Sequence, residues 1–240
     1  MKKRFCFVII TLLLIFILES CNKVTSIRRL QELEEGVSNP NTEAELKDAI
    51  RKYEKRVDDI MIAEERIGIW YKILGSRYMD QKMYKKALKA FQSALEYYPE
   101  NPNLFYQAGL AASLTAKNSL DFELTGTDIE KKRYFDLAVS AYKRALEIDP
   151  KHSKAVYAIS VLYIFELNRP AEAIPILEKI AEWEKKPIDH LFLLGAAYYM
   201  TGENEKAIAV YERIIEISSS AEKKAKAESN IREIRSSGGR

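Results

Sequence analysis

Two histidines are the side chains of this 240-residue sequence best suited to acid–base chemistry near neutral pH. His152 follows a predicted turn and His190 lies near a predicted helix start, and neither has a carboxylate or cysteine at metal-ligand spacing. A catalytic site needs several converging polar groups. The chain has no phosphate-binding glycine-rich loop and no Gly-x-Ser-x-Gly. We therefore expect two surface histidines, no catalytic residue, no metal site and no cofactor, so the chain is not predicted to be an enzyme.

A second candidate for chemistry is the thiol of Cys21, which follows an apolar run. Residues 2–4 are Lys-Lys-Arg, and residues 5–18 form an apolar run of 14 residues. A membrane-spanning helix needs ~20 such residues, whereas a positive head before an apolar core of about 7–15 residues is typical of a signal peptide. We expect residues 1–20 to be a signal peptide.

The residues Leu-Glu-Ser-Cys at positions 18–21 resemble a bacterial lipobox. The resemblance implies that a diacylglycerol is attached to the Cys21 sulfur and an acyl chain such as palmitate to its new amine. Glu19 departs from the small residue usual at its position, and an uncleaved N-terminal anchor and ordinary secretion are the alternatives. Cys6 would leave with the signal peptide, so the mature chain could form no internal disulfide.

Composition and charge narrow the fold class and the partner. Only 9 glycines and 7 prolines occur beside abundant alanine, leucine, glutamate and lysine, which favours an all-helical chain. Without residues 1–20, the chain carries 35 basic and 34 acidic side chains. This balance argues against a nucleic-acid partner, because a nucleic-acid backbone requires a clustered positive face.

A spaced pattern of small and aromatic residues recurs along the chain. From Gly75, aromatic residues follow at +3 and +16 and alanines at +12 and +19; from Gly195, the +3, +12 and +16 positions match. Gly109 follows Gly75 by 34 residues, and a weaker unit has Ser160 in the glycine position. Self-similarity at a fixed period of this length indicates stacked structural repeats.

The pattern Leu-Gly-x-x-Tyr, followed by Ala-x-x-x-Phe-x-x-Ala, resembles the tetratricopeptide repeat, a family of helix–turn–helix units. The resemblance implies an all-α fold in which antiparallel helix pairs stack into a right-handed superhelix, an α-solenoid. It covers four units, with an insertion in the second at about 117–133, and their expected bounds are 68–101, 102–152, 153–187 and 188–219.

Small residues in the middle of both helices of a unit are expected to let the two helices approach closely. The candidate helix-packing residues are Gly75, Ala87, Ala94, Gly109, Ala138, Ala145, Gly195 and Ala207. We expect Tyr78 and Phe91 to fill the space between neighbouring pairs. Packing then offsets the helix-propensity cost of glycine, about 1 kcal/mol against alanine.

Several segments depart from the repeat. The second unit has 17 extra residues, and 118–126 is expected to be a loop that is either a tolerated insertion or a partner contact. In the third unit, Pro175 is expected to shift the helix that starts near Pro170.

The segments that flank the repeats have their own expected roles. We expect residues 21–40 to be a lipidated tether with a short helix, and 41–67 to be an N-terminal helix, capped by Thr42, or a degenerate repeat. Residues 220–240 are expected to form a cap helix with a tail that is disordered from residue 236.

The family resemblance implies that partners bind in a groove formed by the first helices of the units. Most of the matching positions are aromatic or aliphatic, and only Lys72 resembles the family's clamp for a peptide carboxylate. The candidate groove residues are Lys72, Ser76, Met79, Tyr106, Leu110, Ser113, Tyr157, Val161, Ile164, Phe192, Ala196 and Tyr199. An apolar groove suits a hydrophobic segment of a partner protein. The alternatives are that these residues belong to the core, that the chain's own N-terminal segment fills the groove, and that partners bind the convex face or an edge.

Together these patterns predict a membrane-anchored scaffold in the bacterial cell envelope that faces the periplasm and binds a protein or peptide partner. Asn22 follows the cysteine in place of the aspartate that marks inner-membrane retention, which favours the outer membrane. The alternatives are binding of a small apolar ligand and an accessory role in a periplasmic transporter or an envelope assembly machine.

Overall fold

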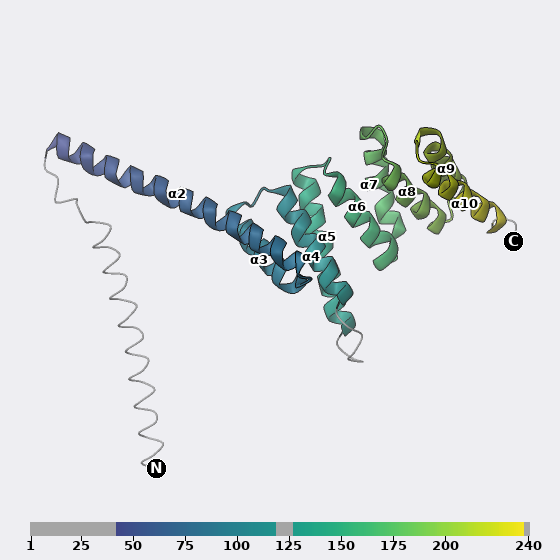
Figure 1. Ribbon diagram of the computed structural model, residues 1–240, viewed down its shortest axis with the longest axis horizontal. Helices are drawn as coiled ribbons and strands as arrows, with labels where there is room; N and C mark the ends of the chain where they lie inside the picture. Colours follow the sequence, from purple (N-terminus) through teal and green to yellow (C-terminus); the bar gives the residue numbers. More distant parts are fainter. Residues whose placement is uncertain (1–41, 119–126, 238–240) are drawn as a thin grey trace, which may run out of the picture. The chain divides into compact units, whose positions relative to one another are not determined.

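The computed structural model describes residues 42–118 and 127–237 (Figure 1). The expected signal peptide, Cys21, the tether and most of the expected loop at 118–126 lie outside these residues. The chain divides into two units, with the boundary between Ile62 and Ala63.

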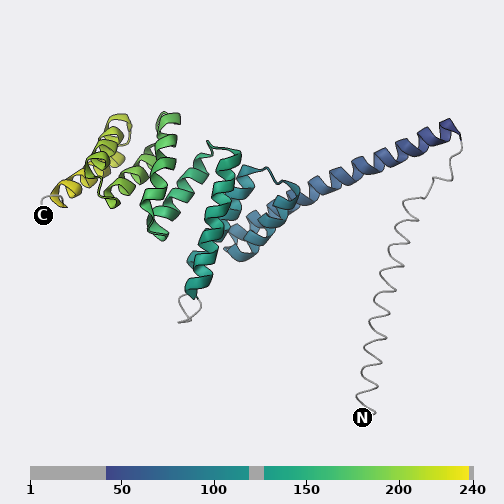
Figure 2. The same ribbon diagram turned by 180° about the vertical axis from the view of Figure 1, so that it is seen from behind.

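Every regular element within the described ranges is a helix, and the expected all-α solenoid is confirmed. The first five helices are α2 (Glu43–Asp80), α3 (Tyr84–Tyr97), α4 (Pro102–Asn118), α5 (Thr127–Ile148) and α6 (Ser153–Val161). The π-helical segment η1 (Leu162–Glu166) follows α6 and precedes α7 (Pro170–Trp183), α8 (Ile188–Met200), α9 (Asn204–Ile217) and α10 (Ala221–Ser237). In the second unit, each helix from α3 onward packs against the next along the chain (Figures 1 and 2).

Helix α2 begins at the cap that the sequence predicts. The Glu45 amide donates to the Thr42 hydroxyl at 3.3 Å, and the Thr42 amide donates to the Glu45 carboxylate at 3.1 Å. These reciprocal bonds form a capping box. The helix then continues to Asp80, so residues 43–67 and the first helix of the first repeat are a single helix without a turn.

Each repeat glycine lies against an aromatic ring from the second helix of its own pair. A Cβ atom built on Gly75 would lie 2.5 Å from the Phe91 ring, and one on Gly109 would lie 2.6 Å from the Tyr142 ring. Gly195 has the same relation to Tyr211. The glycine therefore accommodates a ring within the pair, whereas we expected Phe91 to fill the space between pairs. The expected packing alanines Ala87, Ala94, Ala138, Ala145 and Ala207 are fully buried.

The π-helical turn η1 accommodates one extra residue in the third repeat. Ala173 follows Ser160 by 13 residues, whereas Ala87 follows Gly75 by 12. Within η1, the Leu167 amide donates to the Leu162 carbonyl, five residues back, at 3.0 Å. Because a π turn inserts a single residue into an α-helix, the first helix of this repeat keeps its packing despite the longer spacing.

The turns between the two helices of a repeat contain a residue in the left-handed conformation. Lys82, Asn168 and Gly202 have φ values of 58°, 52° and 82° and follow the first helices of the first, third and fourth repeats. Beyond the third turn, Pro170 occupies the first turn of α7 and Pro175 lies inside that helix. α7 nevertheless continues to Trp183.

Helix α10 closes the C-terminal end of the second unit by packing on α9. Its apolar face consists of Ala227, Ile231 and Ile234, all of which are buried. The helix extends to Ser237, so Ser236 is helical, whereas we expected disorder from that residue onward. Among the described helices, we find none whose length and apolar character would allow it to cross a membrane.

Candidate functional site

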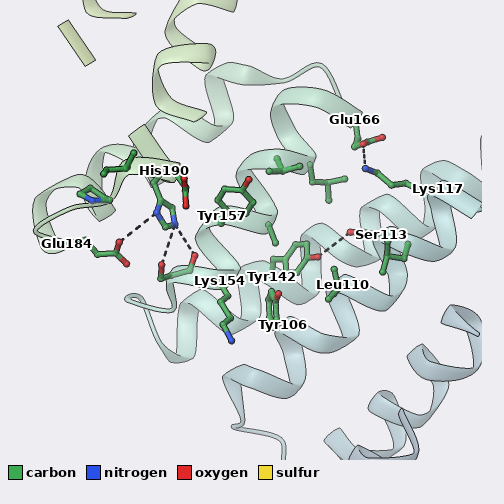
Figure 3. Close-up of a pocket in the computed structure, with 18 of the residues that line it drawn as sticks. Tyr106, Leu110, Ser113, Lys117, Tyr142, Lys154, Tyr157, Glu166, Glu184 and His190 are labelled. Carbon is green, nitrogen blue, oxygen red and sulfur yellow. Dashed lines mark hydrogen bonds and ion pairs between the residues drawn. The ribbon is translucent and has the colours of Figure 1, made fainter. Parts of the chain in front are cut away.

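A pocket of about 600 Å³ opens in the second unit between α4, α6 and the turn that leads into α8 (Figure 3). Its apolar side chains come from all three elements and are Leu110, Leu114, Ala158, Val161, Leu162 and Ile188. Charged side chains of both signs also line it, and they are Lys117, Lys154, Lys186, Glu166, Glu184 and Asp189. Three lysines and three carboxylates give the pocket no net charge.

Helical spacing directs two stripes of side chains into this pocket. On α4, Tyr106, Leu110, Ser113 and Lys117 follow one another by 4, 3 and 4 residues. Positions three and four apart lie on one face of a helix. On α6, the stripe begins at Lys154 and includes Tyr157 and Val161. The first helices of two consecutive repeats therefore supply opposite walls of the pocket.

Tyrosine side chains form the floor at the α4 side. The Tyr106 and Tyr142 rings are 6.1 Å apart between centroids, and the Tyr142 hydroxyl lies 3.4 Å from the Ser113 hydroxyl. Burial raises the pKa of Tyr142, and also that of Tyr106. Both phenols therefore remain neutral at physiological pH.

His190 forms the end of the pocket that lies near α8. Its Nε2 atom is 3.1 Å from the Ser153 carbonyl oxygen. A carbonyl oxygen only accepts, so Nε2 carries the proton and donates to it. The Tyr157 ring meets the imidazole edge-on at 5.8 Å, and the Glu184 carboxylate lies 3.8 Å from Nδ1. His190 is thus part of a packed polar cluster.

His152 is a helix cap beneath the pocket. Its Nδ1 accepts the Ala155 amide at 3.1 Å, so its Nε2 donates to the Asn103 side-chain oxygen at 3.0 Å. His152 and His190 are only 9% and 7% exposed, so the expectation of surface histidines was wrong. Both are buried because the turns between repeats fold their rings against Tyr106 and Tyr157.

An ion pair marks the opposite end of the pocket. The Lys117 ammonium at the end of α4 lies 2.5 Å from the Glu166 carboxylate, which belongs to η1. Figure 3 shows this pair at one end, the His190 cluster at the other and Tyr157 between them. The arrangement is suited to holding a short apolar group whose two ends carry polar atoms.

The residues of this pocket support catalysis or metal binding less well than they support the binding of an apolar group. No group of three or more histidine, cysteine, aspartate or glutamate side chains within residues 42–118 and 127–237 is placed to hold a metal ion. Figure 3 shows the Lys117–Glu166 ion pair and the Glu184–His190 contact at opposite ends of the pocket. The apolar lining and the polar groups at the two ends suit the site to binding by burial of apolar surface and by polar contacts.

The structure brings together only some of the candidate groove residues. Tyr106, Leu110, Ser113, Tyr157 and Val161 line the pocket. Lys72, Ser76 and Met79 lie on α2 and do not line it, and neither do Ile164, Phe192, Ala196 and Tyr199. Ile164 is fully buried in the core, as one of our alternatives states.

Phe192 packs toward the C-terminal end of the unit. Its ring centroid is 6.1 Å from that of Tyr211, and the Lys226 ammonium of α10 lies 5.3 Å from the ring centroid. Lys226 of α10 therefore covers part of the Phe192 ring. Tyr199 remains 37% exposed on α8.

The charged ends and the α8 side of the pocket were not predicted from the sequence. Lys117 was detectable, because it extends the α4 stripe by one turn beyond Ser113. Glu184 and Pro187 in the turn between repeats, and His190 in the first turn of α8, carried no such signal, because they come from the next repeat. Their position depends on how one pair stacks on the next.

Sequence comparisons identify the repeats. Models of the tetratricopeptide repeat match residues 69–101, 130–152 and 191–218. A protein of Borreliella burgdorferi described as a TPR repeat-containing protein is 27% identical over 207 residues, which cover 86% of this chain and 87% of that protein.

Solved structures show the same fold. A crystal structure of MamA protein has a TM-score of 0.57 at 20% identity and covers 72% of this chain and 83% of its own. TTC0263, a thermophilic TPR protein of Thermus thermophilus, has a TM-score of 0.54 at 15% identity, with coverages of 78% and 91%. YrrB, described as a TPR protein with an unusual peptide-binding site, has a TM-score of 0.52 at 20% identity, with coverages of 87% and 89%.

Proposed function

The chain is a tetratricopeptide repeat protein, and from that premise we propose that it is a scaffold that holds another protein by a short apolar segment bound between α4 and α6. Proteins of this family generally act as non-catalytic scaffolds for protein–protein interaction. The observation that carries the proposal is the pocket itself, because the first helices of two consecutive repeats line it with exposed or half-buried side chains.

The pocket's chemistry indicates what the bound segment contains. A volume of about 600 Å³ lies within the usual range of ligand sites. Its centre is aliphatic and aromatic, and charges of opposite sign lie at both ends. A peptide with two or three apolar side chains would bury them in the centre, and its backbone and flanking polar groups would meet the ends. YrrB is a TPR protein with an unusual peptide-binding site, and we extend peptide binding to this chain.

Site-specific photocrosslinking tests this proposal. A benzophenone amino acid at Tyr157, which is 42% exposed inside the pocket, is expected to capture one partner protein in intact cells of the native host. The same group at Tyr199, which is similarly exposed but outside the pocket, is the matched control and is expected to capture none of that partner.

Two outcomes would contradict the peptide-binding proposal. Capture of a lipid or another small apolar molecule at Tyr157 would support ligand binding instead. Equal capture of the same protein at both positions would show that the partner covers the surface without using the pocket.

We further propose that the protein is a lipoprotein anchored in the bacterial envelope and facing the periplasm. The support is the cationic head at residues 2–4, the apolar run at 5–18 and the Leu-Glu-Ser-Cys sequence at 18–21. Two or three acyl chains on Cys21 would anchor the protein stably, where a single chain gives only marginal binding. Asn22, in place of the aspartate that marks inner-membrane retention, favours the outer membrane over the inner membrane.

Detergent phase partitioning tests whether the protein carries a lipid anchor. The protein made in its native host is expected to enter the detergent phase of Triton X-114, and its N-terminal peptide is expected to carry the mass of a diacylglycerol on Cys21. Cys21→Ser removes the acceptor sulfur and blocks processing, so its N-terminal peptide should retain residues 1–20. An unmodified cysteine in the native protein would refute lipidation.

A further inference from the structure

A cluster of basic side chains lies outside the peptide pocket, where α3 and α5 begin. Residues 81–95 contain four lysines and no acidic residue. Lys89 follows Lys85 and Lys86 by four and three residues, so these three lysines share one side of α3. All three are exposed, whereas the buried residues of α3 lie on the opposite side of the helix. The solvent-facing side of the first two turns of α3 is therefore basic.

Contacts between α3 and α5 add a further cation to this surface. The Lys85 ammonium lies 3.3 Å from the Glu130 carboxylate and 5.8 Å from the centroid of the Tyr134 ring. The Arg133 guanidinium lies 5.3 Å from the centroid of the same ring. A hollow of about 490 Å³ joins the two helices, and lysines of α3 and of the preceding turn line it beside Glu130 and Tyr134. We call the cations of this surface the basic patch, which consists of Lys82, Lys85, Lys86, Lys89 and Arg133.

The basic patch has a local excess of positive charge. The whole chain carries 38 basic and 35 acidic side chains, so its charges nearly balance. Among the residues that the structure describes, the five cations of the patch form one ion pair, between Lys85 and Glu130. The Lys86 ammonium and the Arg133 guanidinium lie over aromatic rings instead. The patch can therefore attract a surface that carries several negative charges.

Folding alone does not favour lysines at these positions. The N-terminal end of a helix is the positive end of its dipole, where cations are unfavourable. Lys82, Lys85 and Lys86 lie at this end of α3, whose first turn contains no acidic residue and whose N-cap, Met83, forms no side-chain cap hydrogen bond. Lys85 and Lys89 are also like charges one turn apart, which repel. A bound anionic surface would offset these unfavourable terms.

Exposed apolar side chains beside the basic patch favour a lipid surface as the partner. Met83 and Ile129 are 43% and 75% exposed. Met83 lines the same hollow as the lysines, and Ile129 lies four residues before Arg133, on the same side of α5. Lysines and apolar side chains together are typical of surfaces that bind at the interface of an anionic membrane. A small soluble anion would leave both apolar side chains in water.

We propose that the basic patch docks the second unit on a membrane surface that contains anionic phospholipids. The patch belongs to α3, α5 and the turn before α3, whereas the peptide pocket lies between α4 and α6 and shares no residue with the patch. Docking therefore leaves the pocket free. The proposal requires neither the lipid anchor nor the peptide-binding function. An anchored chain would nevertheless bring the patch to the membrane at a high effective concentration.

A fluorescent label beside the patch tests docking in the full chain. The environment-sensitive dye NBD is attached to Met83→Cys in a Cys6→Ser/Cys21→Ser background, and the purified protein is bound to vesicles of phosphatidylcholine with or without phosphatidylglycerol. NBD emission per vesicle-bound chain is expected to be about twofold higher or more with phosphatidylglycerol. The N-terminal apolar run is the same in both samples, so it does not account for a difference. Met200→Cys is the matched control, because Met200 is 45% exposed on α8 outside the patch, and its label is expected to show no increase.

Charge reversal tests whether the patch itself causes the increase. Lys86→Glu/Lys89→Glu is expected to abolish the increase in NBD emission at Met83→Cys. Lys179→Glu/Lys185→Glu changes the net charge equally at exposed lysines outside the patch and is expected to retain most of the increase. A glutamate at position 86 suits the dipole of α3, so the first double variant is expected to unfold at no lower temperature than the parent. Loss of the increase could then not be ascribed to unfolding.

Three outcomes would overturn membrane docking by the patch. The first is equal emission from the Met83→Cys label on the two kinds of vesicle. The second is an equal effect at the two labelled positions or in the two double variants, because net charge rather than the patch would then be responsible. The third is an increase with polyglutamate in solution but none with phosphatidylglycerol, which would assign the patch to an acidic protein segment.

Discussion

Replacing Tyr142 with alanine is expected to lower the free energy of unfolding by about 3–5 kcal/mol. The Tyr142 side chain is 1% exposed and fills the space above Gly109 in the second repeat. Its removal leaves a large cavity between two helices that cannot close, because the flanking repeats hold them apart. Urea denaturation followed by circular dichroism measures the loss. Tyr142→Phe keeps the ring and gives up only the contact of 3.4 Å with Ser113, so it is expected to cost about 1 kcal/mol or less.

Substitution of Gly109 tests the same contact between the glycine and the Tyr142 ring. Gly109→Ala is expected to destabilise the native chain by about 1–3 kcal/mol, because the added Cβ would lie 2.6 Å from the buried Tyr142 ring. In the Tyr142→Ala background the clash is gone, and alanine is favoured over glycine in a helix by about 1 kcal/mol. The same substitution should therefore stabilise the double variant. If Gly109→Ala changes the free energy of unfolding by the same amount in both backgrounds, the space occupied by the Tyr142 ring does not require glycine at position 109.

The spacing of residues predicted the repeats but not the contact that each glycine makes. The intervals from Gly75 to Ala87 and Phe91 show which residues share a unit. They do not say whether the Phe91 ring turns toward its own pair or toward the next, because both directions are compatible with one helix face. Only the crossing of the two helices decides this, and it places the ring on Gly75.

The third repeat shows a similar division between what spacing can and cannot reveal. The 13-residue interval from Ser160 to Ala173 signals one extra residue. The position of this extra residue depends on backbone hydrogen bonding. The π turn at 162–166 accommodates the extra residue inside the first helix of the repeat. As a consequence Glu166 belongs to that turn, where it reaches Lys117 and closes one end of the pocket.

The pocket residues that lie on one face of α4 or α6 could be predicted from the sequence. Tyr106 and Leu110 on α4, and Tyr157 and Val161 on α6, were expected from their positions within the repeat, and all four line the pocket. His190 was not, because it is brought to α6 by a turn from the next repeat. Stacking between repeats, unlike periodicity within a helix, leaves little trace in a single sequence.

A second large effect is expected for the binding of peptides to the pocket. Peptides selected from a random library on the wild-type protein should share two or three apolar residues in a short window, because the pocket centre is aliphatic and aromatic. Val161→Asp is expected to weaken the binding of such a peptide by about 100-fold, or about 2.8 kcal/mol. The reason is that the bound peptide would bury the new carboxylate in an apolar centre without a partner. Isothermal titration calorimetry measures the change.

A half-buried valine outside the pocket separates loss of binding from loss of structure. Val210 on α9 is half-buried like Val161 but does not line the pocket, so Val210→Asp introduces the same charge at comparable burial elsewhere in the second unit. It is expected to change peptide affinity less than twofold, with both variants retaining the helical circular dichroism of the parent. Equal losses in the two variants would mean that the substitutions act on the fold. Unchanged affinity in Val161→Asp would mean that the selected peptides bind elsewhere. A peptide bound in the pocket would place an apolar side chain against the carboxylate at position 161 and would therefore lose affinity.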